Sequence, residues 1–139
     1  MKIILDCDCV VADFIGAVCT LAGEPRELVD KTDWFETAYG SEITTHIKTQ
    51  LNDFRWWESI PVLKGARGGV EFLRSNGHEI IWCTAPWRSC FGWESSRRWW
   101  LEKNFQAKEH QDSMVFTHEK YLVQATAMID DMLSMVVPW

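Results

Sequence analysis

The chain has 139 residues, of which 47% are hydrophobic and 24% charged, a balance typical of one globular domain with its own core. Its formal net charge of −6 argues against general affinity for nucleic-acid polymers, because phosphate backbones are bound by basic surfaces. No apolar stretch approaches the length of a membrane span, and the five cysteines, with no signal peptide before them, predict reduced thiols in a cytoplasmic protein.

The first half of the chain predicts one strand followed by helices. Residues 2–7 contain a continuous apolar run that is ended by polar residues, which predicts a buried strand of a parallel sheet. Apolar residues then recur with helical spacing, which predicts a helix over residues 10–21. Charged residues and aromatic pairs follow, and they predict a small helical insertion over about residues 17–61, within a core formed by residues 1–16 and 62–139.

The second half of the chain alternates helices and strands. It predicts helices over residues 67–75 and 93–105 and a short helix over residues 119–126. Strands are predicted over residues 78–84, 113–117 and 127–131. This alternation predicts an α/β fold with a mostly parallel sheet between helical layers.

Polar residues come where the predicted strands end, and the ligand crevice of such sheets lies outside these carboxyl ends. Asp6 and Asp8 follow the first strand, Thr84 ends the second, Lys120 follows the third, and Asp130-Asp131 ends the fourth. We therefore expect these side chains to meet in one crevice.

These residue types suit phosphoryl chemistry with a hard cation. Carboxylates so close together repel one another unless a cation such as Mg²⁺ binds them. The hydroxyl of Thr84 and the ammonium of Lys120 suit phosphate oxygens. Asp6 and Asp8 are two residues apart, so in extended backbone both reach one centre, where one attacks phosphorus and the other transfers protons.

The order of these motifs resembles the haloacid dehalogenase (HAD) superfamily of phosphatases. The matching motifs are "DCDCV", the threonine of "IIWCTAPW", Lys120 and the "MIDD" acids. Within that superfamily, "DCDCVVADF", "WFETAYG", "WWESIPVLKGA", "CTAPW" and "THEKYLVQATAMIDD" resemble the 5′(3′)-deoxyribonucleotidases. The resemblance implies a three-layer Rossmann-like core with a helical cap, Mg²⁺, and hydrolysis of (deoxy)ribonucleoside monophosphates.

The resemblance also implies roles for the acidic residues. Asp6 is expected to be the nucleophile and a metal ligand. Asp8 is expected to be the acid/base and to bind Mg²⁺ through its backbone carbonyl. Asp131 would be the third protein ligand of Mg²⁺, and Asp130 would hold a metal-bound water.

Substrate contacts are implied in the same way. The residues expected to hold the phosphate are Thr84, Ala85 and Lys120. The aromatic residues of the insertion that are expected to lie near the base are Trp34, Phe35 and Trp57.

Three features depart from the family pattern. Cys9 stands where glycine is usual, so the turn after Asp8 must be made with a side chain present. His118 stands where the family commonly has arginine. The eight residues after Asp131 are too few for a crossover and another parallel strand, so we expect an exposed edge strand that is either covered in a homodimer or left by a minimised fold.

Two other functions remain open at this point. One is a phosphatase for a sugar phosphate or another small metabolite, and the other is a degenerate, non-catalytic binding module. On the helix over residues 93–105, we expect Trp99-Trp100 to pack on the sheet and Arg97 and Arg98 to be solvated, with Glu94 within reach of one of them.

Overall fold

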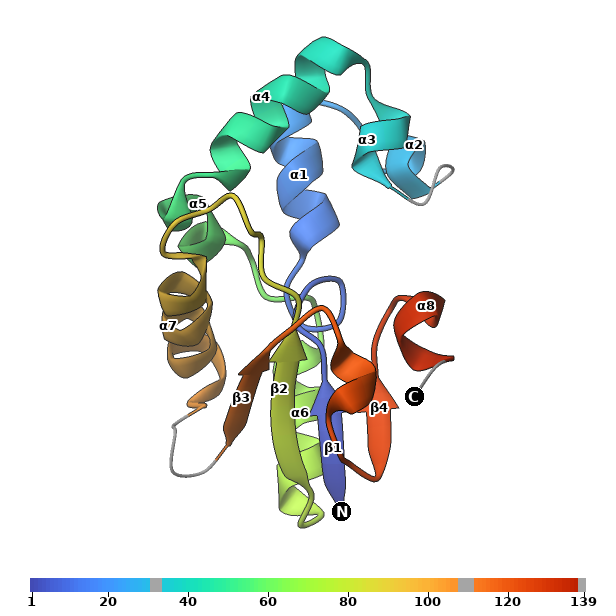
Figure 1. Ribbon diagram of the computed structural model, residues 1–139, viewed down its shortest axis with the longest axis vertical. Helices are drawn as coiled ribbons and strands as arrows, with labels where there is room; N and C mark the ends of the chain where they lie inside the picture. Colours follow the sequence, from blue (N-terminus) through green and yellow to red (C-terminus); the bar gives the residue numbers. More distant parts are fainter. Residues whose placement is uncertain (31–33, 108–111, 138–139) are drawn as a thin grey trace.

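A central parallel sheet organises the molecule, which is described by a computed structural model over residues 1–30, 34–107 and 112–137. Its four strands are β1 (Lys2–Leu5), β2 (Glu79–Thr84), β3 (Ser113–Phe116) and β4 (Ala127–Ile129). They lie in the order β3-β2-β1-β4, and all pairs are parallel (Figure 1). The predicted α/β fold with a parallel sheet is therefore confirmed, and it is compatible with a Rossmann-like arrangement.

The register of the strands brings their polar ends together. Leu5 of β1 lies opposite both Trp82 of β2 and Ile129 of β4, so the residues that follow these three emerge at one edge of the sheet. Thr84, the last residue of β2, lies opposite Phe116 of β3. The sequence pattern thus delivers its acidic and hydroxyl groups to the same edge.

The two faces of the sheet are covered very differently. Helices α6 (Ala66–Ser75) and α7 (Trp93–Phe105) pack on one face, over a core that includes Leu5, Ile80 and Trp82. The opposite face buries a small cluster around Ile4 and Ile81. That cluster is covered by the segment between β3 and β4, which lies in front of the sheet in Figure 1.

The segment between β3 and β4 differs from its prediction. In place of a helix over residues 119–126 it forms one turn of 3₁₀ helix, η1 (Lys120–Leu122). The turn ends because Val123 is extended, and the backbone N–H of Thr126 already donates to the carbonyl of Lys2 beside β1. The third layer of the predicted fold is therefore this one turn and its flanking loop.

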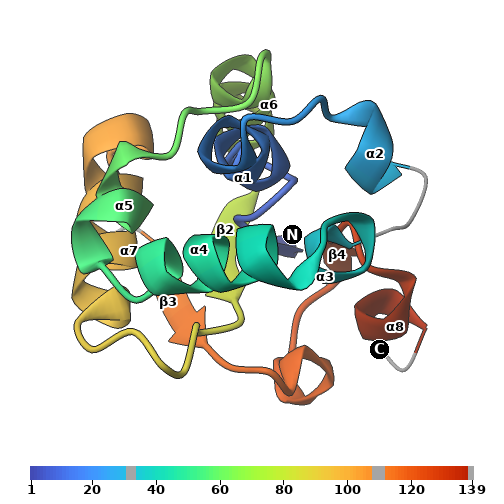
Figure 2. The same ribbon diagram turned by 90° about the horizontal axis from the view of Figure 1, so that it is seen from above.

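Most of the predicted insertion lies beyond the carboxyl ends of the strands (Figures 1 and 2). It begins within α1 (Phe14–Ala22) and contains α2 (Glu27–Asp30), α3 (Phe35–Ala38), α4 (Ser41–Leu51) and α5 (Phe54–Ser59). Helix α4 packs on α1, whereas α5 packs on α7 of the sheet layer. Helix α5, the last helix of the insertion, therefore packs against the core.

The first helix begins later than predicted. Residues 10–13 belong to a loop in which the carbonyl of Cys7 accepts hydrogen bonds from the backbone N–H groups of Val10, Val11 and Ala12. Helix α1 then starts at Phe14, because the side chain of Asp13 caps it by accepting from the N–H of Gly16. The apolar spacing from Val11 onward thus includes both loop and helix.

Strand β4 lies at an edge of the sheet, as expected, and the short helix α8 (Leu133–Val136) follows it. The pairing of two copies through this edge stays a prediction. Within the described residues, every helix is too short or too polar to cross a lipid bilayer.

Candidate active site

A pocket of about 260 Å³ opens at the carboxyl ends of the strands. Its polar lining combines residues from all the strand ends named above: Asp6, Asp8, Cys9, Thr84, His118, Lys120 and Asp131. Its apolar lining consists of Phe14, Trp34, Trp57, Ala85, Pro86, Trp87, Met132 and Met135. One end of the pocket is therefore charged, while aromatic and methionine side chains form much of the rest.

The loop after β1 presents both of its carboxylates to this pocket. The backbone N–H of Asp6 donates to the carbonyl of Ile129 at 3.0 Å, which extends the pairing of β1 with β4 by one step. Cys9 adopts the left-handed conformation with a φ of 61°. The turn is thus made with a side chain present, as predicted, in a conformation that L-residues other than glycine disfavour.

Lys120 joins two of the carboxylates beneath the pocket. Its Nζ lies 2.6 Å from Oδ1 of Asp6 and 2.7 Å from Oδ2 of Asp130, and all three side chains are buried. Burial raises the pKa of Asp6 to about 7, against the opposing effect of the Lys120 ammonium. Although burial lowers the pKa of Lys120, the charges of Asp6 and Asp130 raise it above its usual value, so the lysine stays charged.

Three carboxylates lie close enough together that they could hold a cation. One oxygen from each of Asp6, Asp130 and Asp131 lies within 4.8 Å of the others. Asp131 is exposed, whereas Asp130 already accepts from Lys120 and from the N–H of Met132. Lys120 offsets one of three negative charges, and oxygen ligands with excess charge suit Mg²⁺.

The carboxylate of Asp8 is paired with Arg97, a residue that we expected to be solvated. Arg97 of α7 is fully buried, and its Nη2 donates to Oδ1 of Asp8 at 2.7 Å. Burial raises the pKa of Asp8, and the Arg97 guanidinium opposes that rise. The expectation for Arg97 was wrong because it rested on the charge of the side chain without the aromatic residues that surround it.

Those aromatic residues gave a signal in the sequence. Trp93 and Trp100 stand four residues before and three residues after Arg97, so all three lie on one face of α7. A helix face with an arginine between two tryptophans indicates a buried cation over aromatic rings. Trp100 is buried as expected, whereas its neighbour Trp99 is 43% exposed.

Thr84 and Ala85 lie at the end of β2, where they line the pocket beside Asp6. Thr84 is buried, and its carbonyl accepts from the backbone N–H of Thr117 at 3.1 Å, which extends the pairing of β2 with β3. The carbonyl is therefore used by the sheet, and the hydroxyl is the group of Thr84 that is suited to a ligand.

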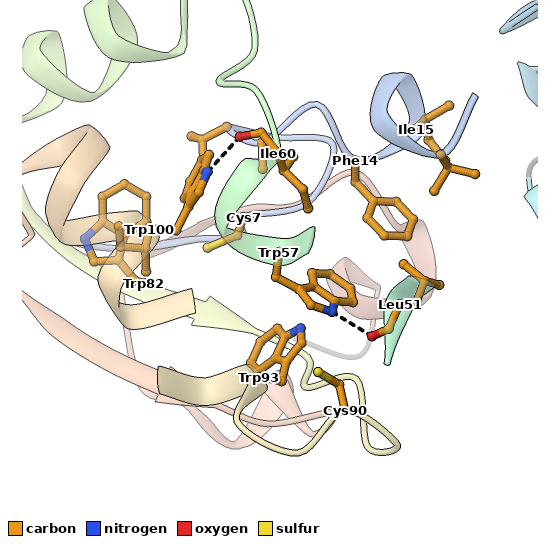
Figure 3. Close-up of a cluster of buried hydrophobic side chains, with 14 of the residues drawn as sticks. Cys7, Phe14, Ile15, Leu51, Trp57, Ile60, Trp82, Cys90, Trp93 and Trp100 are labelled. Carbon is orange, nitrogen blue, oxygen red and sulfur yellow. Dashed lines mark hydrogen bonds between the residues drawn. The ribbon is translucent and has the colours of Figure 1, made fainter. Parts of the chain in front are cut away.

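The aromatic wall differs from expectation at one position. Trp34 and Trp57 line the pocket, with Phe14 stacked between them at centroid distances of 6.0 and 5.7 Å. Phe35 does not line the pocket, because its side chain is fully buried behind Phe14 and Trp34. Figure 3 shows Trp57 between Phe14 and Trp93, with its indole N–H donating to the carbonyl of Leu51.

Several lining residues were not foreseen from the sequence. Trp87 follows β2, and Met132 and Met135 come from the segment around α8. Trp87 comes three residues after Thr84 at a strand end, which is a usable signal, whereas the methionines carried none. His118 also lines the pocket, in the position where we noted a departure from the family pattern.

Cys9, the cysteine that lines the pocket, and Cys7 beside it are poorly suited to act as nucleophiles. All five are free, and burial raises the pKa of Cys7 well above the ordinary range and that of Cys9 to about 12. Thiols with such pKa values stay protonated near neutral pH, and the thiolate is the reactive form. The carboxylates are therefore the candidate nucleophiles of the pocket.

The fold and the pocket define an α/β protein whose parallel sheet gathers carboxylates and one lysine at its strand ends. No protein-family model matches this chain, and no curated protein matches it either. The sequence motifs and the geometry of the pocket are therefore the grounds on which its function is inferred.

Proposed function

We propose that the protein is a Mg²⁺-dependent phosphomonoesterase with a HAD-type core, which hydrolyses (deoxy)ribonucleoside 5′-monophosphates through an aspartyl-phosphate on Asp6. One observation carries this proposal. A single pocket is lined by three carboxylates, a buried lysine and several aromatic rings, and two of the carboxylates, Asp6 and Asp131, also belong to the cluster with Asp130. Other arrangements of the same residues would not offer a nucleophile, a phosphate clamp and a cation site together.

Asp6 is suited to the nucleophilic step. With a pKa of about 7, it is substantially ionised at neutral pH, and the nearby Lys120 favours that form. The attack of an Asp6 oxygen on phosphorus would expel the alcohol and leave the phosphoryl group on Asp6. Asp8, which lines the same pocket two residues later, is placed to transfer protons in this step and in the hydrolysis that follows.

Lys120 and Thr84 would hold the phosphoryl group during both steps. Lys120 is already charged and fixed by two carboxylates, so no reorganisation is needed when the phosphate arrives. A Mg²⁺ held by Asp6 and Asp131, with Asp130 behind them, would neutralise phosphate charge and offset the repulsion among the carboxylates.

The size and lining of the pocket support a small, planar leaving group. A pocket of about 260 Å³ suits one small molecule rather than a polymer. Phe14 and Trp57 are buried and stacked on one another, whereas Trp34 and Trp87 are partly exposed and offer flat apolar surfaces, which favour a nucleobase over a sugar that needs hydroxyl partners. Within the proposal, helices α2 to α4 act as the cap that carries part of this surface.

Phosphate release from panels of nucleoside monophosphates and sugar phosphates, with and without Mg²⁺, tests the proposal. We expect Mg²⁺-dependent turnover with a preference for nucleoside monophosphates. Asp6→Asn should abolish it while the variant stays folded. Asp53→Asn is the matched control, because Asp53 caps α5 away from the pocket and asparagine caps equally well.

Two results would contradict parts of this proposal. A clear preference for sugar phosphates would remove the substrate class while keeping the reaction. Failure of the wild-type protein to release phosphate from any substrate in the presence of Mg²⁺ would remove the reaction, and the non-catalytic binding module would then be the better reading.

A further inference from the structure

Arg97 is a cation without access to solvent. Its side chain is 0% exposed, and its guanidinium lies 5.2, 5.4 and 5.5 Å from the ring centroids of Trp57, Trp93 and Trp100. A buried charge is costly unless neighbouring groups compensate for it. Three aromatic faces and one carboxylate supply that compensation, and together they fix where the guanidinium points.

The guanidinium makes one charged contact, and that contact reaches the pocket. Its Nη2 donates to Oδ1 of Asp8 at 2.7 Å, whereas Nε and Nη1 have no hydrogen-bond partner in the part of the chain that the structure describes. Asp8 lines the pocket, but Arg97 does not. Trp57, one of the rings beneath the guanidinium, lines the pocket too, but Asp8 is the lining residue that accepts a hydrogen bond from Arg97.

We propose that Arg97 is a positioning residue that fixes the carboxylate of Asp8 for proton transfer. A cationic N–H that donates to Oδ1 makes that oxygen the weaker base, so a proton on this carboxyl group is favoured on Oδ2. The rings around Arg97 prevent the guanidinium from turning away, so the choice between the two oxygens is made before a substrate binds. This inference rests on the proposed phosphatase reaction.

In that reaction the role of Oδ2 is defined at each step. When Asp6 forms its bond to phosphorus, the bond between phosphorus and the ester oxygen breaks, and that oxygen takes the proton from Oδ2 of Asp8. When water then attacks phosphorus, its proton passes to Oδ2, and the bond between phosphorus and Asp6 breaks. Phosphate leaves, and both aspartates return to their starting forms.

Substrates with different leaving groups separate positioning from simple core packing. The leaving oxygen of a nucleoside monophosphate needs a proton, whereas para-nitrophenolate leaves without one. Because kcat/KM reports the steps up to formation of the aspartyl-phosphate, it excludes the later hydrolysis, in which Asp8 acts on both substrates alike. A variant that only loosens the core should lower kcat/KM for both substrates by the same factor. A variant that misplaces Asp8 should lower kcat/KM mainly for the nucleotide.

The experiment compares kcat/KM for thymidine monophosphate and para-nitrophenyl phosphate in Arg97→Met and Arg97→Lys. For Arg97→Met we expect a loss of about 10²-fold on the nucleotide, in the range that general acid catalysis supplies, and a loss below about threefold on the nitrophenyl ester. Arg97→Lys keeps the charge without the planar fork, and we expect an intermediate ratio. It also supplies the ratio if Arg97→Met does not fold.

The matched control is Arg98→Met. Arg98 is the next residue of α7 and lies over the ring of Phe116 at 5.6 Å, so its substitution removes the same charge from the same helix without touching Asp8. We expect its ratio of kcat/KM values for the two substrates to equal that of the wild-type protein. Equal losses on both substrates in the Arg97 variants, or no loss on either, would overturn the positioning role.

This outcome is distinguishable from failure of the proposed reaction. If the wild-type protein hydrolyses neither substrate, the phosphatase assignment fails, and the Asp8–Arg97 contact is then judged by unfolding alone. A double-mutant cycle of Asp8→Asn and Arg97→Met should be strongly non-additive if Arg97 fixes Asp8. Additive losses of stability would overturn the inference in that case too.

Discussion

Two buried arginine–aspartate pairs lie at opposite ends of the sheet, and their burial is reversed. Asp112 stands just before β3 and pairs with Arg74 of α6; there the carboxylate side chain is 5% exposed and the arginine 33%. In the pair of Asp8 and Arg97, the arginine is 0% exposed and the carboxylate 24%. The carboxylate of the first pair, Asp112, is therefore hidden from solvent, whereas the carboxylate of the second pair, Asp8, stays accessible.

The two pairs also differ in their other hydrogen bonds, which the Arg74–Asp112 pair makes to neighbouring elements. Asp112 also accepts from the indole N–H of Trp82 at 3.1 Å, and Arg74 donates to the carbonyl of Phe105 at 2.6 Å. That pair ties α6, α7 and β2 together, which is a structural task. Asp8 has its arginine partner on one oxygen and the pocket beside it, which is what a reacting group needs.

The largest expected effect comes from removing each carboxylate charge in turn. Asp8→Asn should lower kcat by about 10²- to 10⁴-fold, because proton transfer is lost. Asp112→Asn should leave kcat per folded molecule nearly unchanged and lower the free energy of unfolding by about 3 kcal/mol, because a buried pair is broken. Urea unfolding and kinetics on the same preparations measure both. A loss of kcat in Asp112→Asn that matched that of Asp8→Asn would refute the distinction between the pairs.

The pair of Asp6 and Lys120, buried on both sides, extends the comparison to pH. The pKa of Asp6 is about 7 in the folded protein against about 3.9 in an unfolded chain, so between these values the folded state binds more protons. The stability contributed by this group is therefore complete below about pH 4 and is lost as the pH rises through about 7. Burial raises the pKa of Asp8 and Asp131 too, with the same sign.

Unfolding measured from pH 4 to pH 8 without divalent cations checks this. We expect the free energy of unfolding to fall with rising pH, and Asp6→Asn to flatten the slope while Asp53→Asn keeps it. Added Mg²⁺ should stabilise the wild-type protein more at pH 8 than at pH 5, because the metal binds ionised carboxylates. An unchanged slope in Asp6→Asn would show that Asp6 is not the group responsible.

The smallest effect concerns the loop that carries Asp8. Cys9 is left-handed, so Cys9→Val should lower the free energy of unfolding by about 1–2 kcal/mol, because a β-branched residue is strained there. Cys9→Gly should change it by less than about 1 kcal/mol, since relief of strain is offset by entropy lost on folding. Gln106, the other non-glycine with positive φ in the described ranges, supplies a control outside the pocket as Gln106→Gly. If Cys9→Val were as stable as Cys9→Gly, residue 9 would not be strained by the left-handed conformation.

The sequence predicted well those features that depend on a single helix or strand. The spacing of apolar residues placed α7 at residues 93–105 and gave the strands to within two residues, because burial of one face is a local property of the pattern. Strand ends then located Asp6, Thr84 and Asp131, since parallel strands bring their carboxyl ends together.

The sequence was less informative where partners come from different elements. Arg97 was misjudged because one of its rings, Trp57, belongs to α5, about forty residues earlier in the chain. Phe35 and Trp34 are neighbours in sequence, yet packing against Phe14 turned one into the core and left the other at the pocket. Loop hydrogen bonds to the carbonyl of Cys7 delayed the start of α1, and apolar spacing does not report them.

Strand β4 brings a kinetic consequence. It has three residues and pairs only with β1 among the described strands, yet Asp131 and the methionines around α8, which follow it, line the pocket, and Asp130 joins the carboxylate cluster. Short edge elements open locally at lower free energy than central strands do, so their amides exchange with solvent first. Asp6 directly follows the central strand β1, and Thr84 is the last residue of the central strand β2. Local opening of β4 would therefore move Asp130, Asp131 and the two methionines, while Asp6 and Thr84 stay in place. A cation bound by the cluster would slow that exchange in β4 selectively, which makes the edge strand the natural reporter of occupancy.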